Sequence, residues 1–147
     1  MEIIVCTQRP SRLIGQLVQL WEGSVRATHH FLDNATILEI KQYVPEALQS
    51  VPVLVIARNS SKRPIGFLGT KGDKLEMLFV AAENRDQGVG RQLLQFAIHR
   101  FDLHTVIVNE QNPQARGFYE HMGFHTVNRN ALDEQGRAYP VLTMRRS

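Results

Sequence analysis

The chain alternates short apolar runs, typical of strands, with longer segments in which apolar residues recur every three or four positions, typical of helices. Strands are predicted at residues 2–7, 51–58, 65–70, 75–80, 105–109, 124–129 and 141–145. A first helix is predicted from Pro10 through Val25, broken at residues 27–32. A second runs from Asp33 or Asn34 to about Leu48, and Pro45 is expected to kink or divide it. Two more helices are predicted at residues 88–101 and 113–123.

The spacing of these elements predicts an α+β fold. The strands at residues 51–80 follow one another across short turns, which indicates an antiparallel meander. Between residues 75 and 109 a strand, a helix and a strand follow closely, which predicts a right-handed crossover and a parallel strand pair. The last two strands are expected to form a hairpin that turns at residues 133–136. A ligand is expected at the carboxyl ends of the parallel pair, near Val80 and Asn109.

Composition narrows the class of protein. The 147 residues, 43% hydrophobic and 21% charged, are predicted to form one soluble domain at residues 1–147. The basic residues behind the net charge of +3 are scattered, so no nucleic-acid partner is expected. No metal site is predicted. No signal peptide or membrane-spanning run is found, and we expect a cytoplasmic protein without a membrane partner. The single cysteine, Cys6, lies in the first apolar run and is interpreted as a buried strand thiol rather than a nucleophile.

A glycine-rich loop follows the strand at residues 75–80. Two glycines separated by one residue allow close backbone approach and present N–H groups at a helix N-terminus, where the helix dipole favours an anion. Flanking arginines add charge for the same anion, and a plain glycine turn with solvated arginines is the structural alternative. The predicted pyrophosphate loop consists of Arg85, Asp86, Gln87, Gly88, Val89, Gly90 and Arg91.

A second motif follows the strand at residues 105–109. Asn112 suits a helix N-cap, Pro113 a first helical turn and Gly123 a C-terminal cap. The pattern Arg85-x-x-Gly88-x-Gly90, followed by Asn112-x-x-Ala115-x-x-Phe118-Tyr119-x-x-x-Gly123-Phe124, resembles the GNAT superfamily of acetyl-CoA-dependent N-acetyltransferases. The resemblance implies a mixed, mostly antiparallel sheet of about seven strands, with helices on both faces and a splayed parallel central pair. It also implies acetyl-CoA as cosubstrate and direct acetyl transfer to an amine.

The resemblance further implies roles for single residues. Pantetheine would add to the free edge of Leu78, Phe79 and Val80, whose backbone N–H would stabilise the oxyanion. Tyr119 would protonate the departing thiolate, although it could instead pack with Phe118. Asn109 and Asn112 would reach pantetheine or acetyl groups as amides, although Asn112 could equally be only a helix cap. Arg116 could contact the adenosine end or could simply be exposed.

A base must accept the proton of the attacking amine. Glu76, on the strand of the acetyl-binding edge, is the first candidate, with an outward-facing strand residue as the alternative. His29 or His30 is the second, because histidine titrates near neutral pH, and Glu110 is the third. The acceptor is a small molecule, a protein lysine or a protein N-terminus. Ile107 stands where some N-terminus-acetylating relatives carry glutamate, which disfavours that substrate.

The acceptor pocket is expected at residues 21–32 and at Tyr139 and Pro140, and the protein is expected to be a monomer or homodimer. Two other functions compete with acetyl transfer. A Rossmann-type nucleotide enzyme would share the glycine pair, but Leu93 occupies the place of its third glycine, and the chain is too short for a doubly wound sheet plus a substrate domain. A non-catalytic acyl-CoA sensor would keep the loop without the chemistry, and Tyr119 argues against it.

Overall fold

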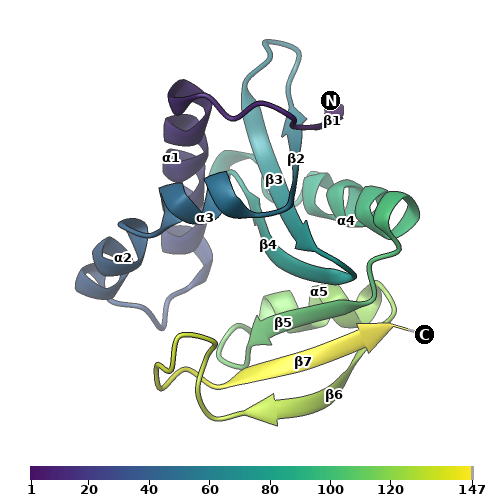
Figure 1. Ribbon diagram of the computed structural model, residues 1–147. Helices are drawn as coiled ribbons and strands as arrows, with labels where there is room; N and C mark the ends of the chain where they lie inside the picture. Colours follow the sequence, from purple (N-terminus) through teal and green to yellow (C-terminus); the bar gives the residue numbers. More distant parts are fainter. Residues whose placement is uncertain (147) are drawn as a thin grey trace.

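A computed structural model describes residues 1–146, and its centre is one seven-stranded mixed sheet in the order β1-β2-β3-β4-β5-β7-β6 (Figure 1). All neighbouring strands are antiparallel except β4 and β5, as predicted. The elements are β1 (Glu2–Val5), α1 (Ser11–Thr28), α2 (Asn34–Lys41), α3 (Val44–Ser50), β2 (Val53–Arg58), β3 (Pro64–Lys71), β4 (Lys74–Val80), the 3-10 turn η1 (Ala82–Asn84), α4 (Val89–Phe101), β5 (Thr105–Asn109), α5 (Pro113–His121), β6 (Phe124–Asn130) and β7 (Val141–Arg146).

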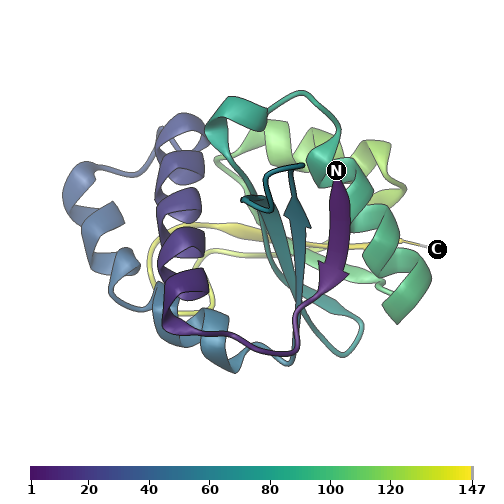
Figure 2. The ribbon, with the colours of Figure 1, turned by 90° about the horizontal axis from the view of Figure 1, so that it is seen from above.

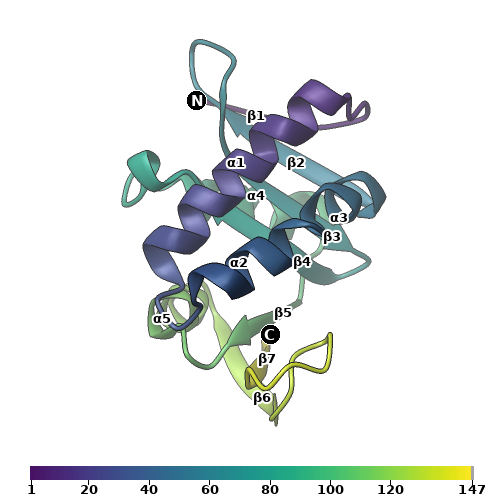
Figure 3. The ribbon, with the colours of Figure 1, turned by 90° about the vertical axis from the view of Figure 1, so that its left-hand side faces the viewer.

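Helices cover the sheet on both sides, which Figure 2 shows with α1 to α3 on one face and α4 and α5 on the other. Two separate apolar cores result. One core joins α4 and α5 to strands throughout the sheet, with Leu93, Leu94 and Val106 fully buried. The other joins α1, α2 and α3 only to β1–β4 and the start of the following turn. Among residues 1–146, the sheet face that carries α1 to α3 therefore has no covering helix over β5, β7 and β6, which lie below α2 in Figure 3.

The parallel pair is splayed. Strands β4 and β5 pair only at Lys74 and Thr105, the first residue of each strand. Because both strands run the same way from this point, their carboxyl ends at Val80 and Asn109 diverge. The predicted V-shaped opening is confirmed, and it exposes one backbone edge of β4.

The predicted division of one helix is confirmed, and one strand boundary differs from the prediction. The segment from Asn34 to Ser50 forms two helices, and the division precedes Pro45, which lies in the first turn of α3 where its missing N–H costs nothing. Asp33 is the N-cap of α2, since its carboxylate accepts the N–H of Thr36 at 2.7 Å. The first strand ends at Val5 rather than residue 7. Cys6 lies just beyond it, donates to the Gln8 carbonyl at 3.0 Å and is only partly buried, which raises the pKa of its thiol.

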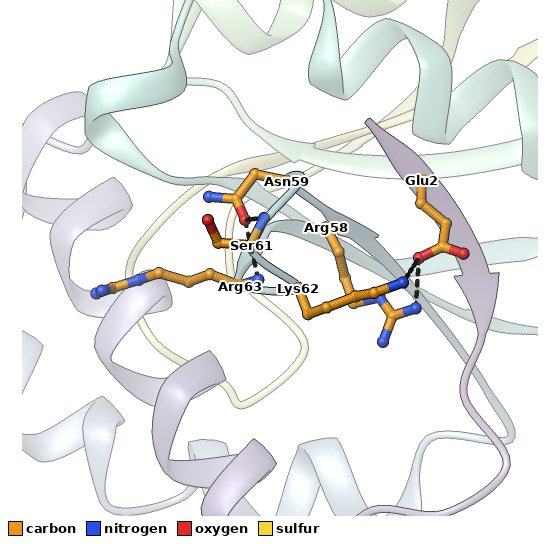
Figure 4. A network of polar contacts seen from close by, with 6 residues as sticks. All are labelled: Glu2, Arg58, Asn59, Ser61, Lys62 and Arg63. Carbon is orange, nitrogen blue, oxygen red and sulfur yellow. Dashed lines mark hydrogen bonds and ion pairs between the residues drawn. The ribbon is translucent and has the colours of Figure 1, made fainter.

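The outer edge of the sheet is held by side-chain contacts across β1, β2 and the β2–β3 turn (Figure 4). The side-chain oxygen Oδ1 of Asn59 accepts the backbone N–H groups of Ser61 and Arg63 at 2.9 and 3.0 Å, which closes the turn. Glu2 forms an ion pair with Arg58 and a longer one with Lys62 at 3.5 Å. Arg58 is the main cause of the lowered pKa of Glu2. This network lies at the β1 edge of the sheet, away from the splay between β4 and β5, and it stabilises that edge.

Candidate active site

A cleft of about 820 Å³ occupies the splay between β4 and β5. Its walls come from six parts of the chain: the end of α1, α2 with the residues before it, β4 from Leu75 to Val80, the glycine loop, α5 with the end of β5, and the β6–β7 loop. The predicted site residues that line it are Glu76, Leu78, Phe79, Val80, Arg85, Asp86, Gly88, Val89, Gly90, Arg91, Asn109, Asn112, Tyr119 and His29. A smaller hollow of about 240 Å³, between α1 and the β2–β3 turn, contains none of them.

The register of β3 and β4 determines which peptide groups face the cleft. Ala81 donates its N–H to the Ile65 carbonyl at 2.9 Å, and Val80 lies opposite Gly66. In an antiparallel ladder this makes Val80 and Gly66 a non-hydrogen-bonded pair. The N–H and C=O groups of Val80, and of Leu78 two residues earlier, therefore point away from β3. They face the splay, where β5 pairs only at Lys74, so they are free to bind an extended ligand.

The glycine loop places an open helix end at one side of the cleft. Gly88 is the N-cap of α4 with a left-handed φ of +81°, and no side chain caps this helix. A Cβ on Gly90 would come only to 3.5 Å from Val80 and 3.8 Å from Phe118, so protein packing alone permits a larger residue there. Arg85 crosses the opening and donates to the Gln114 side chain of α5 at 3.1 Å. Free helical N–H groups, an arginine and a glycine that packing does not require together fit a pyrophosphate.

Two asparagines enter the cleft from the β5 side. Asn112 is the N-cap of α5: its side-chain oxygen accepts the N–H of Ala115 at 3.2 Å, so the capping role is confirmed. The side-chain oxygen of Asn109 is buried and has no partner among residues 1–146. A buried amide oxygen without a partner is costly. A donor on a bound ligand, such as a pantetheine amide, would remove that cost, so Asn109 fits its predicted role.

Tyr119 lies on the wall formed by α5. The centroid of its ring lies 5.2 Å from that of Phe118 and 6.0 Å from that of Phe124, so Tyr119 does pack against Phe118, as one of its two predicted roles requires. The residue is only 8% exposed, and burial raises the pKa of its hydroxyl well above the usual range. No other group within residues 1–146 hydrogen-bonds to this hydroxyl. It therefore stays protonated, and Tyr119 is among the residues that line the cleft.

Glu76 sits where β4 is irregular. Met77 pairs with Gly69 and Leu75 with Thr70, so Glu76 is the extra residue of a β-bulge. Bulges change the direction of a side chain, and Glu76 lines the cleft instead of only facing outward. Its carboxylate lies 3.8 Å from the Lys74 ammonium, which also pairs with Glu134 at 2.7 Å. These two carboxylates raise the pKa of Lys74 against the opposing effect of burial.

His29, directly after α1, lies over β4 on the opposite side from α4. Its ring contacts those of Phe31 and Phe79, with centroids 5.5 and 6.4 Å away. Burial, with a smaller effect from His30, lowers the pKa of His29 to about 4. The imidazole is therefore neutral at physiological pH and able to accept a proton.

This burial predicts a pH-dependent stability. The unfolded histidine has a pKa of about 6.5, so between pH 6.5 and 4 the unfolded state binds more protons than the folded state. Stability from this group is complete above pH 6.5 and is lost as pH falls toward 4, by about 2 kcal/mol between pH 7.5 and 5. The free energy of unfolding in urea should be measured at pH 7.5 and at pH 5. On this acidification the His29→Gln protein should lose about 2 kcal/mol less stability than the wild type. An equal loss in both proteins would contradict the burial of a neutral imidazole.

Several expected residues lie outside the lining of the cleft. Gln87 accepts from the Asn84 side chain at 3.2 Å within the loop, and Arg116 pairs with Glu120 at 3.8 Å along α5. The Glu110 carboxylate binds Arg129 through two bonds of 2.9 and 2.8 Å, and this arginine lowers the pKa of Glu110. Their roles toward a ligand remain predictions.

The β6–β7 loop also contributes residues that the sequence did not reveal. Its turn is confirmed, since Asp133 accepts the N–H groups of Gln135 and Arg137 at 3.0 and 2.8 Å. The loop nevertheless lines the cleft with Asp133, Glu134, Gln135 and Arg137. Arg137 pairs with Glu39 of α2 at 3.3 Å. The loop and α2 thus meet across the end of the cleft opposite α4.

An aromatic contact also joins the β6–β7 loop to the segment between α1 and α2. Tyr139 contacts Phe31 with centroids 6.0 Å apart, so the residues expected at the acceptor pocket do come together there. Trp21, Thr28 and His29 line the cleft from α1 and its end. No helix within residues 1–146 is long and apolar enough to span a membrane.

Sequence comparison agrees with this geometry. The model of the acetyltransferase (GNAT) domain family matches residues 26–143. The chain therefore belongs to the GNAT family of acetyl-CoA-dependent N-acetyltransferases. It is 38% identical over 129 residues to the peptidyl-lysine N-acetyltransferase YjaB of Salmonella typhimurium, covering 88% of each chain.

Solved structures show the same fold. The apo-form solution structure of YjaB from Escherichia coli matches with a TM-score of 0.87 at 36% identity, over 99% of this chain and 97% of that one. The PaiA N-acetyltransferase of Thermoplasma acidophilum, solved with coenzyme A, matches with a TM-score of 0.71 at 18% identity, over 97% and 98%. The second likeness concerns the fold alone. A doubly wound Rossmann sheet, which is mostly parallel, is excluded because five of the six pairs of neighbouring strands are antiparallel.

Proposed function

We propose that this protein transfers the acetyl group of acetyl-CoA to the ε-amine of a lysine side chain in a protein. The observation that carries the transfer is the free edge of Leu78 and Val80, which faces Asn109 and Tyr119 and leads to the open end of α4. The lysine acceptor is supported by the peptidyl-lysine activity named for the relative in Salmonella typhimurium. It also fits the carboxylates of Glu76, Asp133 and Glu134 along the cleft, which attract an ammonium group.

The acetyl donor, acetyl-CoA, would be bound mainly by backbone groups, which do not depend on particular side chains. Backbone N–H groups at the start of α4, with Arg85 and Arg91, would bind the pyrophosphate. The peptide groups of Leu78 and Val80 would pair with pantetheine as an added strand does. One of their N–H groups would donate to the thioester oxygen as negative charge develops on it.

The transfer step moves two protons. The uncharged amine nitrogen attacks the thioester carbon, and the C–S bond breaks as the amide bond forms. The amine proton passes to His29 or Glu76, directly or through water, and the departing thiolate takes the Tyr119 hydroxyl proton. Burial keeps Tyr119 protonated and His29 unprotonated, so each group starts in the state that its role requires.

Acceptor identity can be tested with matched peptides. We expect turnover of acetyl-CoA with a peptide that has an acetylated N-terminus and one internal lysine, and mass spectrometry should locate the new acetyl group on the ε-amine. A peptide with a free N-terminus and no lysine should show at least roughly ten-fold lower kcat/KM, a difference of about 1.4 kcal/mol. Preference for the N-terminal amine, or for a small polyamine over both peptides, would overturn the lysine assignment. Acetyl-CoA binding without turnover of any amine would instead favour the non-catalytic sensor.

A further inference from the structure

We propose that Thr28 is a positioning residue that fixes the tautomer of His29, so that Nε2 of His29 is the atom that accepts the proton from the attacking amine. This inference rests on the proposed acetyl transfer and assigns its base. It begins with two contacts of one hydroxyl group. The Thr28 Oγ1 lies 2.7 Å from the Ser24 carbonyl oxygen and 2.8 Å from His29 Nδ1.

A hydroxyl has one proton to donate, and a carbonyl oxygen can only accept. The Thr28 proton is therefore used in the bond to Ser24. The contact with His29 is then a hydrogen bond only if Nδ1 carries a proton and donates it to Thr28 Oγ1. In a neutral imidazole a protonated Nδ1 leaves the lone pair on Nε2. The arrangement thus selects one of the two neutral tautomers.

The surrounding structure holds the ring in this orientation. Thr28 is the last residue of α1, and His29 follows as its C-cap, with its N–H bonded to the Val25 carbonyl at 2.7 Å. The rings of Phe31 and Phe79 contact the imidazole. Nε2 has no hydrogen-bond partner within residues 1–146 and is not among the atoms buried from solvent, and His29 lines the cleft. Its lone pair is therefore available to a ligand.

Phe79 connects this base to the acetyl-binding edge. The peptide groups of Phe79 pair with Phe67 of β3, while those of its neighbours Leu78 and Val80 face the splay. The Phe79 side chain belongs to the core on the α1 side, which is the side of the sheet away from α4. His29 is thus placed over the free edge from the side opposite the phosphate loop. His29 and this edge both line the cleft, so an amine bound in the cleft could contact both.

Glu76 is the competing base, and its surroundings differ. Its carboxylate is 3.8 Å from the Lys74 ammonium, which also holds Glu134. The Glu76 carboxylate thus already has a cationic partner, whereas Nε2 of His29 has no hydrogen-bond partner within residues 1–146. Glu134 and Glu76 are better placed to attract the cationic lysine, and His29 to take its proton.

The tautomer can be measured without any substrate. Two-dimensional ¹⁵N–¹H NMR of the imidazole distinguishes a protonated from an unprotonated ring nitrogen. At pH 7 we expect wild-type His29 to show Nδ1 protonated and Nε2 unprotonated. The reverse pattern, or an equal mixture, would overturn the positioning role whether or not the protein is an acetyltransferase.

Two variants test the consequence for catalysis: one keeps the shape of Thr28 and the other keeps its hydroxyl. Thr28→Val removes the hydroxyl and should produce a tautomer mixture, with kcat lowered on the order of ten-fold, a part of the 10²–10⁴ that a general base contributes. The KM for acetyl-CoA should not change. Thr28→Ser restores a hydroxyl and should recover both the tautomer and most of kcat. Equal kcat in all three proteins would refute the proposal.

A third variant tests the proposed role of His29 in acetyl transfer separately from the role of Thr28 in fixing its tautomer. His29→Gln should lower kcat by about a hundred-fold or more while acetyl-CoA still binds, as calorimetry would show. Full activity of His29→Gln would show that another group is the base, even if the NMR result holds. Absence of turnover in wild type, with the expected tautomer, would reject the acetyl transfer and retain only the Thr28–His29 bond.

Discussion

Replacing Tyr119 with phenylalanine is expected to lower kcat on the order of ten- to ten-thousand-fold while acetyl-CoA affinity stays within about three-fold. The substitution keeps the ring that packs on Phe118 and Phe124, and removes a hydroxyl that bonds to no other group within residues 1–146. The stability should therefore change by less than about 1 kcal/mol. A hydroxyl that protonates the thiolate acts mainly in the transition state, so its loss appears in kcat.

The measurement needs saturating acetyl-CoA, a true acceptor and a control. Tyr43→Phe removes the same hydroxyl from a side chain that is 61% exposed and outside the cleft, and it should leave kcat unchanged. Calorimetric titration with CoA and thermal unfolding complete the comparison. Full activity of Tyr119→Phe would show that the thiolate leaves unaided or that another group protonates it, and Tyr119 would then be a packing residue only.

The second large effect is expected at Gly88. An aspartate there would place a carboxylate at the uncapped start of α4, where the pyrophosphate is proposed to bind. Losing two charge-assisted hydrogen bonds of about 1.5–3 kcal/mol each should weaken CoA binding by more than about a hundred-fold. The chain should still fold, because no atom lies within 4 Å of a Cβ at this position. Aspartate also tolerates the left-handed region, which Asp86 already occupies at a φ of +62°.

Two controls separate the causes of this effect. Gly88→Asn has the same shape without the charge, and should retain part of the affinity that Gly88→Asp loses. Gly72→Asp introduces the same side chain at a left-handed glycine, with open space around it, in the β3–β4 turn away from the cleft. It should bind CoA normally. Wild-type CoA affinity in a folded Gly88→Asp protein would remove the pyrophosphate from this loop.

Sequence reasoning located those parts of the site that depend on local structure. Gly88 was predicted at the start of α4 and Asn112 at the start of α5, and both are the N-caps of these helices. Such positions follow from backbone conformation and from hydrogen bonds to residues three or four away. The splay of β4 and β5 was expected from the family resemblance, and the single pairing of Lys74 with Thr105 confirms it.

Two features of the site depended on contacts between distant residues. The bulge that turns Glu76 into the cleft arises from the pairing of β4 with β3, and nothing in its neighbours marks it. The residues Asp133 and Glu134 were predicted only as part of a turn. They line the cleft because the β6–β7 loop meets α2 through Arg137 and Glu39, which are 98 positions apart in the chain.

The sequence by itself determined the fold class, the glycine loop and the helix that carries Tyr119, because caps, turns and apolar periodicity are encoded within a few neighbouring residues. Only the tertiary structure decided the pKa shifts of His29 and Tyr119. His29 is an ordinary histidine by sequence, and its pKa falls to about 4 because the chain buries it against Phe79, fifty positions later. The pKa of Tyr119 likewise rises because α5 is packed against the sheet. How deeply a side chain is buried depends on residues from the whole chain, so no local sequence pattern predicts the resulting pKa shift.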